Sequence, residues 1–445
     1  MKFYLNDFYL MKYPLFVFAI LFNFTIKNVS AQNPLPAKKQ NKVIVLQNAT
    51  LHTANATNQV LEKATIIFEN GKITQIGANI SAPAGAEVLD MSGKHVYPGL
   101  ILPSSTVGLT EVDAVRATRD FNEVGAYNPH IRAQIAYNTD AEMLPTIRNN
   151  GILLVQSTPR GGVISGSSSV MELEGWNWED ATLKADDGIH LNWVSFFSYN
   201  WQLGAVEKNK NREKNLNELN EFFITSKAYF QNPQTAQNTK NLRFEAMKGL
   251  FEGSKNLYIH ADLGKEIVEA IDFAKKMGVK KIVLIGGSDS WMLVDYLKEN
   301  NIPVLLNRPH SLPNRADDDI DLAYKLPAML QKAGILVGLN YEGDMEAMGS
   351  RNLPFVAGSA AAYGAPYGLT KEDAIKMITA NTARILGIDN QVGTLEIGKE
   401  ATLIVSGGDI LDMKTSKIEH AFVKGKKLLL NDKQKALYEK FKQKE

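Results

Sequence analysis

The sequence contains no cysteine, which excludes disulfides, thiolate metal ligands, a cysteine nucleophile and a lipid-modified N-terminal cysteine. The chain also lacks a large excess of charge of either sign, because 49 basic side chains are balanced by 48 acidic ones and the formal net charge is +1. A chain without a strong field of its own does not attract a polyanion, so we expect no nucleic-acid partner. No apolar run beyond the N-terminal region approaches the ~20 residues of a membrane-spanning helix, so we expect no membrane span.

The N-terminus has the pattern of a secretory signal peptide. Lys2 and Lys12 precede an apolar stretch over residues 14–24, and a small-x-small cleavage pattern follows at Val29-Ser30-Ala31. The apolar core of about ten residues is shorter than a membrane span. We therefore predict a signal peptide over residues 1–31 and a protein that is secreted across the inner membrane into the periplasm.

Strand patterns open and close the remaining chain. Residues 43–99 alternate short apolar runs with turn signals, among them Asn70-Gly71, a hairpin turn whose two positions both need positive φ. Strand patterns return over residues 393–430. This symmetry predicts that N- and C-terminal strands together form one small composite β-sheet or sandwich domain.

Between these ends, residues 100–392 repeat an apolar strand followed by an amphipathic helix. The pattern is clearest over residues 256–340, where the hydrophobic period switches from 2 to 3.6 and back. Such units form a parallel sheet, and about 290 residues of them favour an α/β fold with a (β/α)8 TIM-like barrel. The polar segment 207–240 predicts a helical insertion, for which a solvated helix pair on the barrel rim is a simpler interpretation than a substrate lid.

Three segments carry a family resemblance: VYPGLILPSSTVGL at 96–109, NLRFEAMKGLFEGSKNLYIHA at 241–261 and TANTARILGIDNQVGTLEIGKEATLIV at 379–405. Their order resembles the amidohydrolase superfamily, in particular imidazolonepropionase-like members, over residues 43–430. The resemblance implies hydrolysis of non-peptide C–N bonds in a cyclic amide or an acylated small molecule. It also implies a metal-bound water, whose pKa falls to about 7 on zinc.

The metal ligands that the resemblance implies are mostly absent. Ser104 and Thr106 stand where the family has a His-x-His pair, and Gly286 stands near its sixth-strand histidine. The fifth-strand histidine maps onto His260, and the eighth-strand aspartate, which binds metal and acts as general base, maps onto Glu342. Two ligands hold zinc weakly. We therefore predict either no cofactor or a single divalent metal, zinc in the first place, at His260 and Glu342.

Further candidate residues come from local patterns. Arg160, in the glycine-rich segment 159–166, is a candidate to bind a carboxylate, although an ordinary loop explains the same residues. His310 is a candidate substrate contact on a second basic rim, whose cations could instead pair with the aspartates at 317–319. The segment 186–190 has cation-ligand residue types, but a turn before a strand accounts for it. The candidate substrate-binding residues are thus Ser104, Thr106, Arg160, His310 and Asp344.

Two functional hypotheses follow. In the first, the chain is a catalytically impaired or non-catalytic member that binds a small molecule, alone, as a homo-oligomer or as the partner of an active amidohydrolase. In the second, it is an active mononuclear or metal-free hydrolase built on His260 and Glu342, with Glu342 as the base. A third class, a periplasmic carbohydrate-binding or envelope-binding module, would need an aromatic strip from the five tryptophans.

Overall fold

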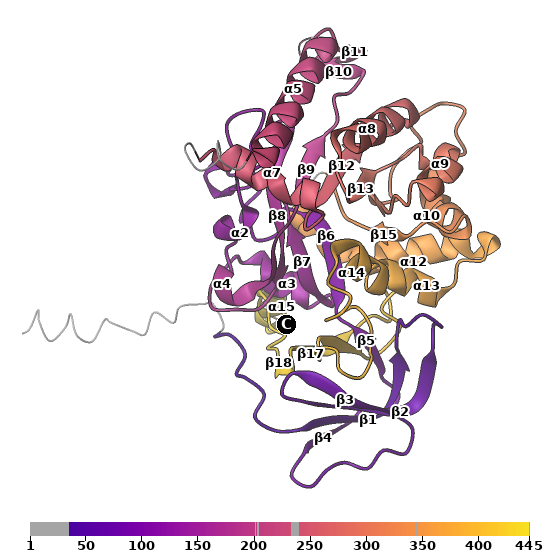
Figure 1. Cartoon of the computed structure of the whole chain (residues 1–445). Helices are drawn as coiled ribbons and strands as arrows, with labels where there is room; N and C mark the ends of the chain where they lie inside the picture. The colour runs from indigo at the N-terminus through magenta and orange to yellow at the C-terminus, as the bar shows by residue number, and fades with distance from the viewer. Residues whose placement is uncertain (1–34, 201, 203, 233–239, 344, 445) are drawn as a thin grey trace, which may run out of the picture. The chain divides into compact units, whose positions relative to one another are not determined.

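The computed structural model describes residues 35–200, 202, 204–232, 240–343 and 345–444. The predicted signal peptide, residues 1–31, and the candidate residue Asp344 lie outside the described residues. Within the described part, no helix is both long enough and apolar enough to cross a membrane. Figure 1 shows the arrangement of the helices and strands.

One sheet joins the two ends of the chain, in the order β18-β17-β16-β5-β1-β2-β3, with β4 pairing with β1. β16 runs antiparallel to β5, so the C-terminal strands extend the N-terminal sheet. The turn between β2 and β3 has Asn70 at φ 50° and Gly71 at φ 79°, as the Asn-Gly pair predicts. The strands are β1 (Ile44–His52), β2 (Val60–Glu69), β3 (Lys72–Gly77), β4 (Glu87–Asp90), β5 (His95–Pro98), β16 (Leu403–Ser406), β17 (Ile418–Val423) and β18 (Lys426–Lys427).

A second eight-stranded sheet forms the barrel wall, in the order β15-β14-β13-β12-β9-β8-β7-β6. This confirms the predicted fold class, an α/β barrel with an additional sheet. The strands are β6 (Leu100–Ser105), β7 (Ile152–Ser157), β8 (Ile164–Glu172), β9 (Thr182–Asn192), β12 (Asn256–Ala261), β13 (Ile282–Gly286), β14 (Val304–Leu306) and β15 (Val337–Leu339).

One strand departs from the expected parallel pattern. β8 runs antiparallel to both β7 and β9, whereas the remaining pairs in this sheet are parallel. The reason is the length of the connection: β7 and β8 are joined only by residues 158–163, and a parallel crossover needs a dozen residues or more. Arg160 therefore lies in a hairpin loop at the C-terminal end of β7.

Helices cover the outside of this sheet. α8 shows why they form: Ile267, Ala270, Ile271 and Ala274 make the predicted apolar stripe and are fully buried, and Gly278 ends the helix at φ 88°. The longer helices are α5 (Arg212–Gln231), α7 (Leu242–Glu252), α8 (Gly264–Met277), α10 (Leu322–Lys332), α12 (Leu353–Gly364) and α15 (Lys433–Lys442). The shorter ones are α2 (Ala133–Ala136), α3 (Met143–Arg148), α4 (Trp178–Ala181), α9 (Val294–Glu299), α11 (Glu346–Gly349), α13 (Lys371–Met377) and α14 (Ala380–Leu386), with 3-10 turns at Arg116–Thr118, Ser290–Leu293, Ser350–Asn352 and Ala365–Tyr367.

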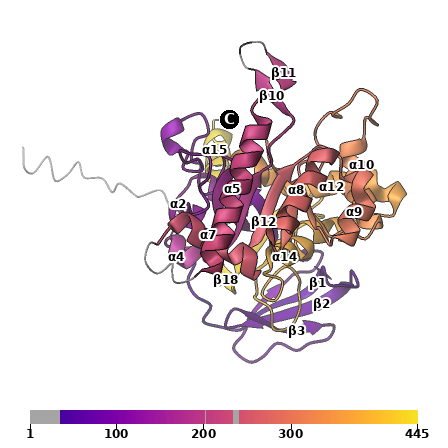
Figure 2. The same cartoon turned by 45° about the horizontal axis from the view of Figure 1, so that its top comes forward.

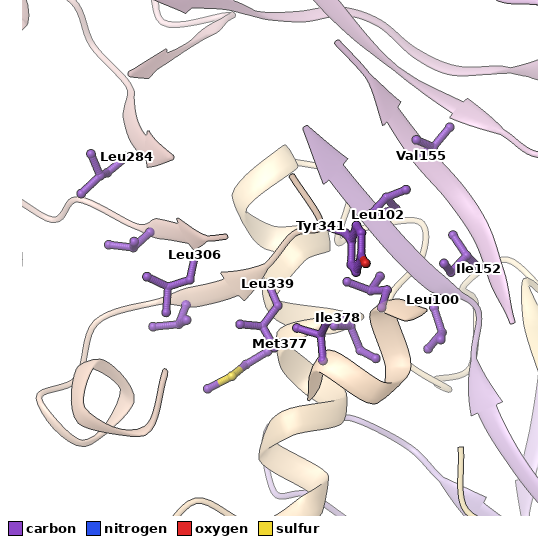
Figure 3. Packing of buried hydrophobic residues seen from close by; sticks show 14 of the residues in the cluster. Leu100, Leu102, Ile152, Val155, Leu284, Leu306, Leu339, Tyr341, Met377 and Ile378 are labelled. Atoms are coloured by element: carbon purple, nitrogen blue, oxygen red, sulfur yellow. The ribbon is translucent and has the colours of Figure 1, made fainter. Parts of the chain in front are cut away.

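The junction between α13 and α14 bridges the two edge strands of the barrel sheet. The backbone N–H of Ile101 in β6 donates to the carbonyl of Ile378 at 2.9 Å, and the amide of Asn381 donates to the carbonyl of Val337 in β15 at 2.9 Å. Figure 3 shows Met377 and Ile378 among the buried side chains of β6 and β15. The junction thus satisfies backbone groups that open strand edges would leave unpaired.

The predicted insertion at 207–240 contains α5, which packs against α7. α7 begins at Leu242, so this second helix lies beyond the predicted bounds. It is not wholly solvated, because Leu219 and Phe223 are fully buried and Phe223 packs edge-on against Phe273 of α8. A hairpin of β10 (Phe197–Asn200) and β11 (Ala205–Lys208) precedes it. Figure 2 shows this hairpin projecting beyond the barrel strands.

Candidate functional site

The candidate residues lie where the barrel strands end. Side chains along each strand alternate between the inside and the outside of the barrel. Tyr258 and Leu305 belong to the inner apolar cluster, so His260 and Asn307, two residues further along, also face inward. The parallel ladder pairs Leu306 with Leu339, which places Asn307 beside Asn340 at the strand ends. Active sites of barrels of this kind form at this end.

Ser104 has a strained backbone at the end of β6. Its φ of 45° lies in the left-handed region, which a residue with a side chain adopts at a cost. In this conformation its N–H donates to Oε1 of Gln156 at 2.9 Å, and its carbonyl accepts from Nη2 of Arg160 at 2.8 Å. Ser104 is the position at which the superfamily resemblance implies the first metal ligand, and its carbonyl thus points toward the guanidinium of Arg160.

Arg160 also forms an ion pair with Glu346, the first residue of α11. Its Nη2 lies 2.8 Å from Oε1 of Glu346, and that same oxygen accepts from the N–H of Thr106 at 2.8 Å. Burial raises the pKa of Glu346; the guanidinium of Arg160 opposes this shift, and the nearby carboxylate of Glu342 adds to it. The largely buried guanidinium of Arg160 therefore pairs with Glu346 and also feels the charge of Glu342.

Two histidines lie next to this group. Nδ1 of His190 is 3.0 Å from Nε2 of His260, and the ring of His190 stacks on Tyr258 with centroids 4.7 Å apart. Burial lowers the pKa of His260 to about 4, with Glu342 opposing the shift and Arg160 adding to it. Burial also lowers the pKa of His190 well below its usual value, and His260 and Arg160 add to that shift. Both imidazoles are therefore neutral at pH 7.

A hydrogen-bonded layer lies beneath the histidines. The hydroxyl of Tyr258 donates to Asp187 at 2.6 Å, Ser168 donates to the same carboxylate at 2.7 Å, and Gln156 does so at 2.8 Å. Asp187 is fully buried, and burial raises its pKa against the effect of these donors. The explanation of residues 186–190 as a turn before a strand is wrong, because the segment lies within β9 and its aspartate is part of the barrel interior.

Several buried polar atoms at this end find no hydrogen-bond partner among the described residues. Asn340 is 0% exposed, and neither its Oδ1 nor its Nδ2 is paired. Nε2 of His190, Oδ1 of Asn307 and Oε2 of Glu342 are likewise unpaired. A buried polar atom without a partner costs free energy that a bound molecule or water recovers. The end of the barrel is thus prepared for hydrogen bonds that the protein itself does not complete.

The structure brings Ser104, Thr106, Arg160, His260 and Glu342 to one end of the barrel. His310 lies elsewhere: its Nε2 is 3.1 Å from the hydroxyl of Ser359 in α12, and its ring packs on Tyr324 in α10. On the same loop Arg315 pairs with Asp318 at 3.7 Å, as the pairing interpretation of that rim predicted. Its shorter ion pair, at 2.5 Å, is with Asp289, which that interpretation did not include.

Glu346, Asn307 and Asn340 were not predicted from the sequence. Glu346 stands four residues after Glu342, and the nearness of the two carboxylates in the sequence was the available signal. Asn340 could also have been predicted from the sequence. It precedes Glu342 by two residues at the end of an apolar strand, and residues two apart on a strand face the same side.

The donor set does not fit the metal that the superfamily resemblance implies. Ser104 and Thr106 offer neutral hydroxyls, and Gly286 offers no side chain. Glu346 is already paired with Arg160, so a metal ion at this point would face a guanidinium. Among the described residues, no group of three or more histidine, aspartate or glutamate side chains is placed to hold a metal ion.

A cavity lies beside this cluster, at the ends of β13 and β14. It offers about 80 Å³ to water-sized molecules and is partly open to solvent. The residues that line it include Asn307, Arg308, Asp289 and Leu326. Asn307 thus connects the cavity with the unpaired polar atoms inside the barrel.

Comparison with known proteins gives a consistent result. The amidohydrolase family profile matches residues 208–428, which include His260, Glu342 and Glu346. The chain is similar to a solved amidohydrolase from Thermotoga maritima MSB8, with a TM-score of 0.75 and 24% identity over 87% of this chain and 99% of that one. It also resembles a triazine hydrolase variant, with a TM-score of 0.51 and 16% identity over 90% of this chain and 99% of that one.

Curated relatives match over short stretches only. A 5-methylthioadenosine/S-adenosylhomocysteine deaminase of Symbiobacterium thermophilum is 33% identical over 87 residues, which are 18% of this chain and 19% of that protein. A dihydroorotase of Trichlorobacter lovleyi is 50% identical over 36 residues, 8% of each chain. The matched segments therefore cover about a fifth or less of the length of these relatives.

Proposed function

Starting from the premise that the chain belongs to the amidohydrolase superfamily, by its family match and its fold, we propose that it binds a polar small molecule at the C-terminal end of the barrel without binuclear metal hydrolysis. The observation that carries this proposal is the set of buried polar atoms that find no partner within the described part of the chain, of which Asn340 contributes two.

The unpaired atoms point to a polar ligand. Asn340 is fully buried with an amide that has no hydrogen-bond partner, and such a group costs about 1–3 kcal/mol relative to a paired one. Asn307 and Glu342 add acceptor oxygens that lack donors. A molecule with both N–H and carbonyl groups would pair with these atoms and offset their cost.

The remaining ligand positions argue against hydrolysis by a metal pair. A binuclear centre needs about three protein ligands for each metal, and hydroxyls occupy the His-x-His positions at Ser104 and Thr106. The guanidinium of Arg160, paired with Glu346 at 2.8 Å, adds an unfavourable charge for any cation there.

Metal content and ligand binding test the proposal together. Protein purified without chelator is expected to contain far less than one metal ion per chain and to melt at the same temperature with and without EDTA. A panel of small polar amides, with hydantoin first, is expected to raise the melting temperature of the wild type but not of Asn340→Leu. Near-stoichiometric metal that is lost in His260→Ala and Glu342→Gln, together with hydrolysis that chelation abolishes, would overturn the proposal.

A second candidate function is metal-free hydrolysis of a non-peptide C–N bond. It is favoured by Glu342, whose Oε2 has no partner and which lies near the neutral imidazole of His260. Glu342 would accept a proton from water as the oxygen attacks the substrate carbonyl, and the departing nitrogen would take a proton in turn. Turnover of cyclic amides in EDTA that Glu342→Gln abolishes would support this candidate over simple binding.

Location and assembly remain part of the proposal. The leader pattern at residues 1–31 supports secretion into the periplasm, which predicts a mature N-terminus at Gln32 or Asn33 when the full chain is expressed in a Gram-negative host. A homo-oligomer, or a complex with an active amidohydrolase, is tested by light scattering on the purified protein. Retention of the leader in a cytoplasmic fraction would contradict secretion.

A further inference from the structure

We propose that the ligand of this barrel carries a carboxylate and that Arg308 binds it in the cavity at the ends of β13 and β14. The inference rests on the proposed function, because it names one chemical group of the molecule that would pair with Asn307 and Asn340.

The guanidinium of Arg308 is available to an anion. Within the part of the chain that the structure describes, its polar contact is with Tyr341, whose hydroxyl lies 3.4 Å from Nη1, and not with a carboxylate. Arg160 and Arg315, by contrast, pair with Glu346 and with an aspartate. A guanidinium has five N–H donors and binds the two oxygens of a carboxylate side by side. Arg308 therefore keeps donors that such a group would use.

A tyrosine and a glycine fix the position of this guanidinium. It lies over the ring of Tyr341, 5.4 Å from the centroid, and a cation at this distance from an aromatic face is attracted to it. Gly343 has a φ of 126°, and a Cβ there would lie 3.1 Å from Nη2 of Arg308. The guanidinium thus packs where a side chain at Gly343 would crowd it. A donor held in place before the ligand arrives loses less entropy on binding.

Two aspartates that line the same cavity are already paired. Both terminal nitrogens of Arg315 donate to Asp289, at 2.9 and 2.5 Å, and the N–H of Gly264 donates to it at 2.8 Å. Asp318 lies 3.7 Å from Nη1 of Arg315 and accepts from its backbone N–H at 3.1 Å. Arg315 thus serves both aspartates and leaves Arg308 to an incoming anion.

The size and lining of the cavity limit the ligand. It offers about 80 Å³ to water-sized molecules, which is room for a group of a few heavy atoms. Leu306, Leu322 and Leu326 contribute apolar lining, beside which a charged hydrogen bond is stronger than in water. Asn307 lines the cavity too, and its Oδ1 finds no donor among the described residues. A molecule with an amide next to a carboxylate would pair its N–H with Asn307 and its carboxylate with Arg308.

The experiment compares N-acetylglycine with N-acetylglycinamide by calorimetric titration of the full chain. The two compounds share one amide and differ in the carboxylate. The wild type is expected to bind N-acetylglycine at least about tenfold more tightly, because hydrogen bonds between charged groups exceed neutral ones. Arg308→Gln should remove this preference and leave the affinity for N-acetylglycinamide unchanged.

The matched control is Arg351→Gln. Arg351 is half-buried and lies outside the cavity lining, with Nη1 3.6 Å from the sulfur of Met348. Its substitution removes the same charge from the chain and should keep the preference for N-acetylglycine. The ratio of the two affinities in the wild type needs no variant, so the test stays decisive if Arg308→Gln does not fold.

The outcomes separate this inference from the proposed function. Equal affinities of the wild type for the two compounds, with binding lost in Asn340→Leu, would overturn the inference and leave the proposed function standing. No binding of either compound or of hydantoin would overturn both. Inorganic phosphate that binds more tightly than N-acetylglycine, and only when Arg308 is present, would overturn the assignment of a carboxylate.

Discussion

His190 and His260 contact each other through Nδ1 and Nε2 at 3.0 Å, inside the barrel, and both are neutral. Because burial lowers the pKa of His260 from 6.5 to about 4, the unfolded chain binds a proton between these values that the folded chain does not. This pair makes folding stability sensitive to mild acid.

The first prediction concerns pH. The free energy of unfolding should fall as the pH drops from 6.5 toward 4, with His260 contributing up to about 3 kcal/mol at 1.36 kcal/mol for each unit of pKa shift. Urea unfolding at several pH values measures this. In His260→Gln the slope over this range should be smaller than in the wild type. An equal slope in both proteins would show that His260 does not titrate as proposed.

The second prediction concerns Asn340. Asn340→Leu should stabilise the ligand-free protein by about 1–3 kcal/mol, since it removes a buried amide that has no partner and keeps the volume. Asn256→Leu is the matched control and should destabilise, because Nδ2 of Asn256 is paired with the hydroxyl of Tyr258 and the carbonyl of Ile385. Chemical denaturation measures both. Destabilisation by Asn340→Leu would mean that the amide is paired after all.

The third prediction concerns Tyr258, whose hydroxyl donates to the buried carboxylate of Asp187 at 2.6 Å. Tyr258→Phe should cost about 1–3 kcal/mol, because hydrogen bonds to charged groups exceed ordinary ones. Tyr137→Phe is the comparison: that hydroxyl is also buried but donates to the backbone carbonyl of Glu172 at 3.1 Å, and its loss should cost about 0.5–1.5 kcal/mol. Equal losses in denaturant titrations would contradict the assignment.

The fourth prediction concerns the contact between the two sheets. Nζ of Lys424, in the turn after β17, lies 2.5 Å from Oε1 of Glu172 at the end of β8, and Glu172 is 1% exposed. Lys424→Met should destabilise by about 3–5 kcal/mol, because it leaves a buried carboxylate without its cation. Adding Glu172→Gln should recover part of that loss. Thermal unfolding checks this, and a second substitution that only adds to the damage would argue against a coupled pair.

The fifth prediction concerns Glu342, whose Oε2 is unpaired. Glu342→Gln removes the charge without leaving a cavity, so the far-ultraviolet circular dichroism spectrum should be unchanged. Any hydrolysis found in the wild type should disappear, because the general base is lost. Unchanged turnover in this variant would remove Glu342 from the mechanism and leave ligand binding as the function of the barrel end.

Local sequence patterns were sufficient to predict individual helices and hairpins. The stripe of Ile267, Ala270 and Ile271 predicts α8, and the Asn70-Gly71 pair predicts the hairpin of β2 and β3, because both depend on periodicity and backbone conformation within a few residues. The superfamily resemblance also implied that Ser104, His260 and Glu342 lie near one another, and the structure has all three at the C-terminal ends of barrel strands. The direction of β8 was missed, although the short connection at 158–163 contained the reason.

Tertiary structure decided the charge of the site. Nothing local connects Arg160 with Glu346, which is 186 residues away in the chain and 2.8 Å away in space. The same holds for the contact of His190 with His260 and for the burial of Asn340, since each depends on neighbouring strands from distant parts of the chain. The sequence by itself determined which residues stand at the strand ends, through patterns of period and turn. Only the packing of the strands against one another decided which of those residues pair, which are buried without partners among the described residues, and which cation the site contains.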